Sequence, residues 1–503
     1  MLARLTLENF KAFKELQTFD LAPLTLIYGP NSAGKSSIIQ SLALLRQTLG
    51  QKAIFSDRLN FRGDLVDLGS YRSIVHNHDK KNRIRISIDY TVKERSVTPL
   101  SSMPRELPRG LDLFFKSAKG IGSRKFNSSQ LDEVRYRLDQ GRLLNVSLIE
   151  TIPDKSHRVF DAYKEGMRFF NWKTKDDLNA YCSLVDALWE RRIKRPASYR
   201  SHQLQLSLLD QQSASFPEAT KETLELLKGA IFHTRGLLPF QMDADEEFLN
   251  YNAMLAPKYR RSPVWQFHLE FIREISKISY LGPIRSHPER QYILTEDLPD
   301  QVGPKGENTA KILLRQQSTL TNELDAWLSR FEINYRTKIR HVGNELTGEI
   351  VSVNLIDTNS GVELTPLDVG FGIGQVLPIL VEGLSSKRKT ICVEQPEIHL
   401  HPRLQGHLAD FFLETAYHPR TNPEGVQWVI ETHSESLMLR LQRRIRERKS
   451  SNPIPLEDIS VIYVDRTNRD NSRATQIRID KDGDFIDEWP NGFFEERFLE
   501  SFL

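Results

Sequence analysis

The sequence predicts an α/β fold in which a mixed sheet with flanking helices is interrupted by a mainly helical insertion. Three observations predict this fold. Short apolar segments end in glycine-rich or acidic turns, a helical pattern follows the first of these turns, and the pattern changes across the middle of the chain. We therefore expect residues 1–95 and 276–503 to form one α/β unit, with residues 96–275 inserted between them.

The composition of the 503 residues is that of a globular protein with a large core, because 39% are hydrophobic and 27% charged. The net charge of +3 argues against a uniformly basic nucleic-acid-binding protein. The two cysteines, Cys182 and Cys392, are too few for a disulfide framework or a zinc cluster, so we expect a cytoplasmic protein. No run of about 18 apolar residues occurs, and we expect no membrane span.

The first elements of the chain lead to a glycine-rich loop. Residues 1–10 alternate between apolar and polar side chains, as in a strand, and residues 24–28 form a short apolar strand. A helical pattern over residues 38–45 follows the loop, and this context of strand, loop and helix supports the phosphate-binding motif G-x-x-x-x-G-K-[ST]. The expected phosphate-binding residues are Gly29, Pro30, Asn31, Ser32, Ala33, Gly34, Lys35, Ser36 and Ser37.

The residue types of this loop suit a nucleoside triphosphate. Glycines let backbone N–H groups turn toward phosphate oxygens, and the N-terminus of the following helix adds positive potential. Lys35 is expected to reach the β and γ phosphates, and Ser36 to place its hydroxyl on Mg²⁺. The motif alone does not decide between ATP and GTP.

The middle of the chain follows a different pattern. Residues 82–93 alternate with period two and predict the last strand of the first part. In residues 96–275 we expect helices, among them residues 176–192 and 219–227, separated by loops that contain proline and serine. Sustained heptads are absent, so a long coiled coil is not expected.

A second apolar strand with an acid at its tip lies far downstream. Residues 389–393 form the strand and Glu394 follows it, the position at which an acid holds Mg²⁺ beside a bound triphosphate. Glu394 therefore joins Ser36 as an expected metal ligand. Gln395 and Glu397, in the same turn, are candidates for orienting or activating the attacking water.

Two further segments complete the expected site. A strand over residues 426–430 leads to His433, which we expect to sense a γ-phosphate, although a histidine in such a turn can also be a simple capping residue. A glycine-rich segment opens a helix before residue 378 and is a second anion-binding helix start. We expect this segment to contact a nucleotide held by a second subunit, through Gly370, Gly372, Gly374 and Gln375.

The order of these motifs resembles that of ABC-type ATPases. More closely, the chain is similar to the SMC-like prokaryotic AAA family ATPases that include the ATPase half of the overcoming-lysogenization-defect (OLD) nucleases. The segments that carry the resemblance are residues 280–285, 394–402, 432–434 and 480–495. The resemblance covers residues 1–95 and 275–503. It implies an ABC-type head, ATP with Mg²⁺ as the bound nucleotide, and a homodimer or higher homo-oligomer that holds ATP between its heads.

One position departs from the pattern of these ATPases. The usual residue after the Walker B acid is a second carboxylate, whereas this chain has Gln395. A glutamine can orient water but cannot accept its proton. We therefore expect slow hydrolysis, with Glu394 or Glu397 taking part, which suits a switch better than a motor.

Charged clusters outside the motifs have plainer interpretations. Basic clusters at residues 191–195, 258–261 and 440–449 could contact nucleic acid, but a solvated helix face is the favoured interpretation of each. The acidic segment Asp480–Asp484 is expected to be a hairpin around Asp482–Gly483, not a metal-dependent nuclease site.

The resemblance also suggests a biological role. Stand-alone ATPases of this kind resemble components of bacterial anti-phage systems such as PARIS and Septu, in which the ATPase controls a separate protein. This implies a separately encoded nuclease or toxin effector and a phage protein as trigger, with nucleic acid as a further candidate partner. An alternative is an SMC-like ATPase of DNA repair or DNA processing, and a third reading is a self-sufficient nuclease.

Overall fold

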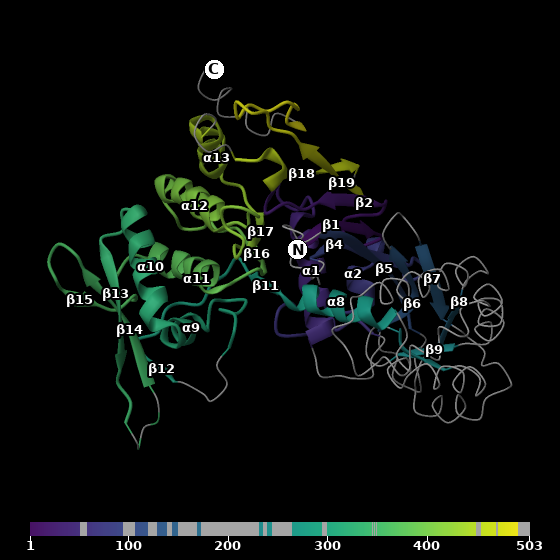
Figure 1. Cartoon of the computed structure of the whole chain (residues 1–503), viewed down its shortest axis with the longest axis horizontal. Coiled ribbons are helices and arrows are strands. Elements are labelled where there is room, and N and C mark those ends of the chain that lie inside the picture. The colour runs from purple at the N-terminus through teal and green to yellow at the C-terminus, as the bar shows by residue number, and fades with distance from the viewer. Residues whose placement is uncertain are drawn as a thin grey trace, which may run out of the picture. The chain divides into compact units, whose positions relative to one another are not determined.

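The computed structural model describes a discontinuous set of residues: 1–50, 58–93, 106–118, 128–137, 143–148, 169–172, 231–234, 239–243, 264–293, 299–344, 346, 348, 350–448, 454–468 and 471–490. The chain divides into two compact units. The first comprises Met1–Gln47, Arg62–Leu68 and Lys277–Leu503, and the second comprises Thr48–Phe61 and Gly69–Ser276. The first unit is thus built from both ends of the chain (Figure 1).

A six-stranded sheet forms the centre of the first unit. Its spatial order is β11 (Ile278–Leu281), β16 (Thr390–Glu394), β17 (Gln427–Glu431), β3 (Leu24–Tyr28), β18 (Ile459–Asn468) and β19 (Asn471–Ile477). The first five strands are parallel, and β19 is antiparallel at the edge. Every residue of β3, β16 and β17 is buried, as expected for the apolar strands of a parallel sheet.

Helices and smaller sheets complete the first unit. The helices are α1 (Lys35–Gly50), α9 (Thr309–Arg315), α10 (Gln317–Arg330), α11 (Phe371–Ser385), α12 (Pro402–Thr415), α13 (Glu435–Arg448) and the short η6 (Leu456–Asp458). Strands β1 (Leu2–Glu8) and β2 (Gln17–Asp20) pair as an antiparallel hairpin. A second antiparallel sheet contains β12 (Tyr292–Ile293), β14 (Ile350–Asp357), β13 (Tyr335–His341) and β15 (Glu363–Leu364).

The predicted mixed α/β fold is confirmed in this unit. The strands expected at residues 24–28, 389–393 and 426–430 are β3, β16 and β17, each within one residue of its expected position. Helix α1 begins directly at Lys35 and continues through the predicted helical residues. The order β3, β17, β16 places the ends of these strands at one edge of the sheet, since all three are parallel.

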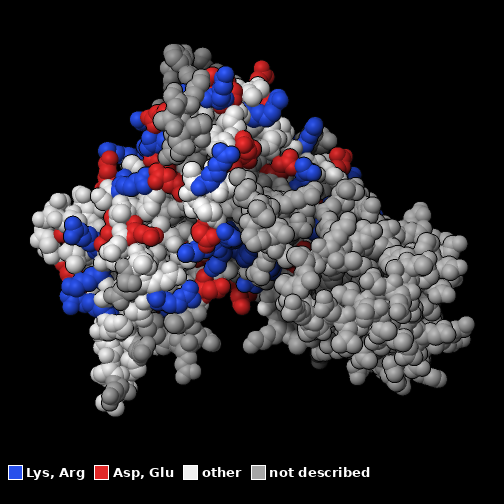
Figure 2. Space-filling view, viewed as in Figure 1, with Lys and Arg blue, Asp and Glu red and all other residues white. Residues whose placement is uncertain are grey.

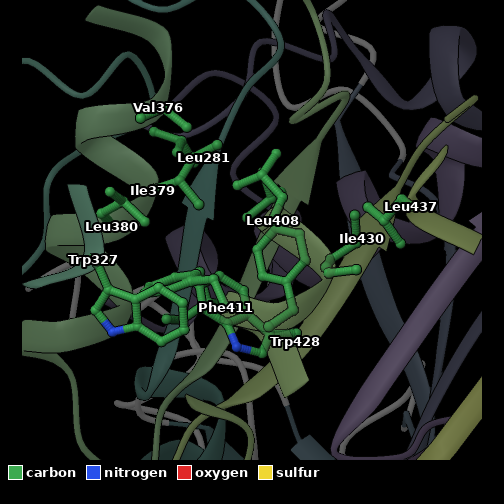
Figure 3. Packing of buried hydrophobic residues seen from close by; sticks show 14 of the residues in the cluster. Leu281, Trp327, Val376, Ile379, Leu380, Leu408, Phe411, Trp428, Ile430 and Leu437 are labelled. Carbon is green, nitrogen blue, oxygen red and sulfur yellow. The ribbon is translucent and has the colours of Figure 1, made fainter. Parts of the chain in front are cut away.

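A large apolar core packs between this sheet and its helices (Figure 3). At its centre Trp428 of β17 is fully buried and packs against the rings of Phe411 and Phe412, with centroids 5.9 and 4.8 Å away. Its indole Nε1 donates to Thr415 Oγ1 at 3.0 Å, so the one polar atom of this side chain is paired. A Cβ added at Gly383 would lie 2.8 Å from Trp428, which explains why a glycine faces the ring on α11.

The second unit contains a series of antiparallel strands. Strands β4 to β10 pair in sequence order, each antiparallel to the next, and have the bounds β4 (Ile84–Lys93), β5 (Glu106–Ser117), β6 (Ser129–Arg137), β7 (Leu143–Leu148), β8 (Phe169–Trp172), β9 (Ile231–Thr234) and β10 (Pro239–Asp243). The unit also contains α2 (Tyr71–Ile74), η1 (His76–His78) and α8 (Val264–Ser276).

The described part of residues 96–275 differs from the mainly helical insertion that we expected. It contains six strands, β5 to β10, and one helix, α8. In β5, Pro108 and Gly110 interrupt the alternating pattern that predicts a strand. The structure requires a glycine at position 110, because a Cβ there would lie 2.2 Å from Oδ1 of Asp89 on the neighbouring strand β4. The helices expected at residues 176–192 and 219–227 lie outside the described residues. Among the helices that the structure describes, none is long and apolar enough to cross a membrane.

Candidate nucleotide-binding site

The glycine-rich loop occupies the turn between β3 and α1. Gly29 and Gly34 have φ values of +142° and +105°, which side-chain-bearing residues rarely adopt. A Cβ at Gly29 would lie 2.0 Å from the carbonyl oxygen of Val464, and one at Gly34 would lie 2.7 Å from Ala12 Cβ. Both glycines are therefore required by backbone conformation and by close packing. Pro30, Asn31 and Ser32 are exposed at the tip of the loop.

Lys35 points into this loop. Its Nζ donates to the carbonyl oxygens of Gly29 and Pro30, at 3.0 and 2.8 Å, and only 3% of the residue is exposed. Burial lowers the pKa of Lys35, although the charges of Glu431 and Glu397 oppose this. The ammonium group is therefore held inside the loop and lies close to two carboxylates.

Ser36 has an acidic partner, Glu431, that the sequence analysis did not name. Its Oγ donates to Glu431 Oε1 at 3.1 Å, while the expectation that Ser36 and Glu394 are both ligands of Mg²⁺ stays a prediction. Glu394 and Glu431 are register partners at the ends of β16 and β17, so both acids lie at the same edge of the sheet. Glu431 is 3% exposed, and its Oε2 has no hydrogen-bond partner among the described residues. Sequence reasoning missed Glu431 because the strand before it was assigned only to position His433.

Glu394 is buried and its carboxylate is held by a tyrosine. Tyr280, in β11, donates its hydroxyl to Glu394 Oε1 at 3.1 Å. Burial, together with the charge of Glu431, raises the pKa of Glu394 to about 7, despite opposing effects from Tyr280, Lys11 and Arg285. The carboxyl group can therefore exchange a proton near neutral pH, which is the property required of a general base or acid.

Glu397 is bound to the turn that follows β17. Its Oε1 accepts the backbone N–H of His433 at 2.6 Å, and its Oε2 accepts the hydroxyl of Thr432 at 2.8 Å. Burial raises the pKa of Glu397, while these hydrogen bonds act in the opposite direction. Glu397 therefore joins the turn after β16 to the turn after β17, a structural role that the sequence did not reveal.

Gln395 and His433 complete this edge of the sheet. Gln395 has φ +45°, a strained backbone conformation, and its N–H donates to the carbonyl of Glu431 at 2.7 Å. His433 is half-buried, and its Nε2 has no hydrogen-bond partner among the described residues. Burial, with the nearby charge of Lys35, lowers the pKa of His433 and keeps the ring neutral near pH 7. A neutral imidazole of this kind can accept or donate one hydrogen bond.

The glycine-rich segment at the start of α11 lies against other parts of the same unit. A Cβ at Gly372 would be 3.2 Å from the carbonyl oxygen of His399, and one at Gly374 would be 2.9 Å from Pro288. Close packing is therefore one reason for these two glycines. Nothing lies within 4 Å of a Cβ at Gly370, and Gln375 is 2% exposed with its Nε2 unpaired among the described residues.

The site fits a bound cation and a polyanion together. Its unpaired buried atoms include an acceptor, Glu431 Oε2, and donors, the Nε and Nη1 of Arg285. Within the described residues, no group of three or more His, Cys, Asp or Glu side chains could hold a metal ion. Mg²⁺ bound to a nucleotide takes one or two carboxylates and completes its shell with phosphate oxygens and water, and Ser36 with Glu431 could supply the protein's share.

The arginines of the one basic cluster that the structure describes are engaged in ion pairs and hydrogen bonds within the chain. In the cluster 440–449, Arg440 Nη1 and Arg444 Nε donate to the carboxylate of Asp410 at 2.9 and 2.6 Å. Basic and acidic side chains are interspersed over the described part of the face in Figure 2. Two further pairs in this cluster are Arg443 with Glu447, and Arg446 with the carbonyl of Asp482. The clusters at residues 191–195 and 258–261 lie outside the described residues.

The acidic segment near the C-terminus forms the expected tight turn. Asp480 Oδ1 accepts the N–H groups of Asp482 and Asp484, and Gly483 has φ +80°. Beyond the turn, Trp489 packs edge-on against Tyr28 at the end of β3, with ring centroids 5.7 Å apart. Asp480 therefore stabilises the turn, and the turn leads to a contact beside the phosphate loop.

Comparisons with known proteins agree with this geometry. A family described as "AAA domain, putative AbiEii toxin, Type IV TA system" matches residues 24–439, and a protein family of unknown function matches residues 454–499. The comparison with curated proteins gave no match.

Among solved structures, the chain is similar to heads of SMC proteins. The Smc head of Pyrococcus furiosus bound to the C-terminal domain of ScpA has a TM-score of 0.37 at 11% identity, over 95% of this chain and 96% of that one. The SMC head domain of Thermotoga maritima has a TM-score of 0.35 at 9% identity, over 95% and 99%. At these scores the likeness carries no argument about function. The family match covers most of the chain, including every motif of the site, and the chain belongs to this AAA domain family.

Proposed function

We propose that the chain is an ATP-binding switch that hydrolyses ATP slowly. The observation that carries this proposal is the convergence of Lys35 with two buried carboxylates, Glu394 and Glu431, and the half-buried Glu397 at one edge of a parallel sheet. A phosphate chain in the loop would take Lys35 away from the carbonyls of the loop. The bound Mg²⁺ would neutralise phosphate charge and would be held by Ser36 with Glu431 or Glu394.

The residues of the chain would divide the remaining work. Glu394, with its pKa near 7, is the candidate proton acceptor for the attacking water, because Gln395 can only orient it. His433 reports the γ-phosphate by a single hydrogen bond. The start of α11 at Gly370, where nothing lies within 4 Å of an added Cβ, faces the nucleotide of a second copy, so that two heads close around ATP.

We further propose that this switch controls a separately encoded nuclease or toxin effector in an anti-phage system. The family description, which names a putative toxin and a Type IV TA system, supports this direction. The arginines of α13 that pair with Asp410 give no support to DNA binding by this helix. The effector that the switch controls, and the trigger, would then be proteins.

A direct test measures ATP binding by Lys35→Ala, with Lys14→Ala as the matched control because Lys14 is exposed on the same unit. We expect the first variant to lose ATP binding and the control to keep it. Normal ATP binding by Lys35→Ala would refute the assignment of the loop.

The rate and the partner need separate measurements. We expect turnover well below the roughly 10 s⁻¹ that is typical of enzymes. Stimulation of the pure chain by DNA would instead support an SMC-like DNA-processing ATPase. Co-purification of the chain with the products of neighbouring genes, followed by mass measurement, identifies an effector and the oligomeric state together.

A further inference from the structure

Arg285 is a buried arginine beside the candidate site, and the sequence motifs assign no role to it. It lies four residues after β11 and is 3% exposed. Its Nη2 donates to the backbone carbonyl of Glu394 at 3.0 Å, so the guanidinium reaches across from the end of β11 to the end of β16. Its Nε and Nη1 are buried and have no hydrogen-bond partner among the described residues.

The neighbouring carboxylates do not satisfy these donors. Glu394 and Glu397 are the acidic groups whose charges act on Arg285. However, both oxygens of Glu397 accept hydrogen bonds from the turn after β17, and Oε1 of Glu394 accepts from Tyr280. A buried, permanently charged side chain with unpaired donors is costly, and such groups are characteristic of functional sites.

The strand order shows which end of a bound nucleotide Arg285 would meet. The phosphate loop follows β3, and β16 lies two strands away from β3, about 10 Å at the spacing of a sheet. Lys35 donates to the loop carbonyls of Gly29 and Pro30 after β3, and Arg285 donates to the carbonyl of Glu394 after β16, so the two cations belong to different strand ends. Lys35 lies in the phosphate loop, and Arg285 lies at the end of β16. The last phosphate of a triphosphate bound in the loop would extend toward β16 and Arg285.

We propose that Arg285 binds the terminal phosphate of the nucleotide held by the same chain and thereby distinguishes a triphosphate from a diphosphate. An arginine presents its donors in a fixed fork that matches phosphate oxygens, which suits two unpaired donors of one guanidinium. This inference rests on the proposed binding of ATP.

The segment that carries Arg285 also contacts the signature helix. Pro288 packs against Gly374 of α11, since a Cβ added at Gly374 would lie 2.9 Å from Pro288. Arg290 forms a bidentate pair with Asp368, just before α11. A change in the position of Arg285 on phosphate binding would therefore act on the start of α11 through the short stretch 285–290.

The test compares affinities for Mg²⁺–adenylyl imidodiphosphate, a non-hydrolysable triphosphate, and Mg²⁺–ADP in the full chain. The variants are Arg285→Gln, Arg285→Lys and, as a control, Arg440→Gln, which removes another largely buried guanidinium of the same unit. We expect Arg285→Gln to weaken triphosphate binding by about 10- to 100-fold and to leave ADP binding within about twofold. Arg285→Lys should be intermediate, and Arg440→Gln should not change the ratio of the two affinities.

The outcomes separate this inference from the proposed function. If the wild type binds the triphosphate and Arg285→Gln binds both nucleotides as the wild type does, or loses both equally, Arg285 is not a terminal-phosphate ligand. If the wild type binds neither nucleotide, both proposals fail. Thermal unfolding of the nucleotide-free variants shows whether they fold, and Arg285→Lys carries the test if Arg285→Gln does not.

Discussion

Replacing Glu394 by glutamine tests the electrostatics of the site in the nucleotide-free, metal-free protein. Glutamine has nearly the same shape, and its amide oxygen can still accept the hydroxyl of Tyr280. The substitution removes only the negative charge that burial and Glu431 disfavour. The pH dependence of the difference in stability between wild type and variant therefore follows the protonation of Glu394 and its coupling to Glu431.

The structure gives the sign and the size of the effect. The folded protein raises the pKa of Glu394 from 4.5 to about 7. Below pH 4.5 the carboxyl is protonated in both the folded and unfolded states, so the raised pKa costs no stability there. As the pH rises from 4.5 through 7, the unfolded state releases its proton first, and the wild type loses about 3 kcal/mol of stability at about 1.4 kcal/mol per tenfold change.

The assay is thermal unfolding of both proteins in EDTA at a series of pH values. Since 1 kcal/mol moves the midpoint of a large domain by about 2–4 °C, we expect Glu394→Gln to gain about 6–12 °C over the wild type between pH 4.5 and pH 8. Ionisable groups that do not interact with Glu394 shift both curves together and cancel in the comparison, whereas Glu431, whose charge acts on Glu394, contributes to the difference. A difference between the two midpoints that stays constant with pH would refute the reasoning.

Two further predictions concern the loop and the core. Gly29→Ala should destabilise the protein by about 3 kcal/mol or more in urea unfolding, because the residue has a φ of +142° and the new Cβ would lie 2.0 Å from the carbonyl oxygen of Val464. Gly348→Ala is the control: its φ is +76°, nothing lies within 4 Å of a Cβ there, and the substitution should cost about 1 kcal/mol. Equal losses of stability in the two variants would contradict the packing argument. Trp428→Ala should cost about 3–5 kcal/mol by the same measurement, since the ring is fully buried, while Leu346→Ala, at a residue 97% exposed, should change stability by less than about 0.5 kcal/mol.

Local patterns were sufficient to predict the centre of the fold. The apolar strand at residues 24–28, the glycine loop and α1 follow one another directly, so the motif and its context lie in one stretch of sequence. The strands before Glu394 and before His433 are short apolar runs with polar ends, and this pattern also depends on neighbouring residues alone. The mixed α/β architecture followed from these three segments.

Contacts between distant residues could not be predicted in the same way. The bond between Ser36 and Glu431 joins residues 395 positions apart, and it depends on β17 lying between β3 and β16. The sequence contains Tyr280 and Arg285 in a recognisable segment, but their proximity to Glu394 follows only from β11 pairing with β16. In the second unit, Pro108 and Gly110 concealed a strand that is stabilised by its neighbours.

The central sheet also constrains when the protein can fold during synthesis. Strand β3 lies between β17 and β18, so its two neighbours are made more than 400 residues after it. At about 5–20 residues per second, the apolar strand before the phosphate loop waits roughly 20–90 s for its partners. A nascent chain with such distant contacts folds slowly and exposes apolar surface meanwhile. We therefore expect full-length synthesis to precede any nucleotide binding, so that ribosome-bound fragments ending before β17 would be targets for chaperones.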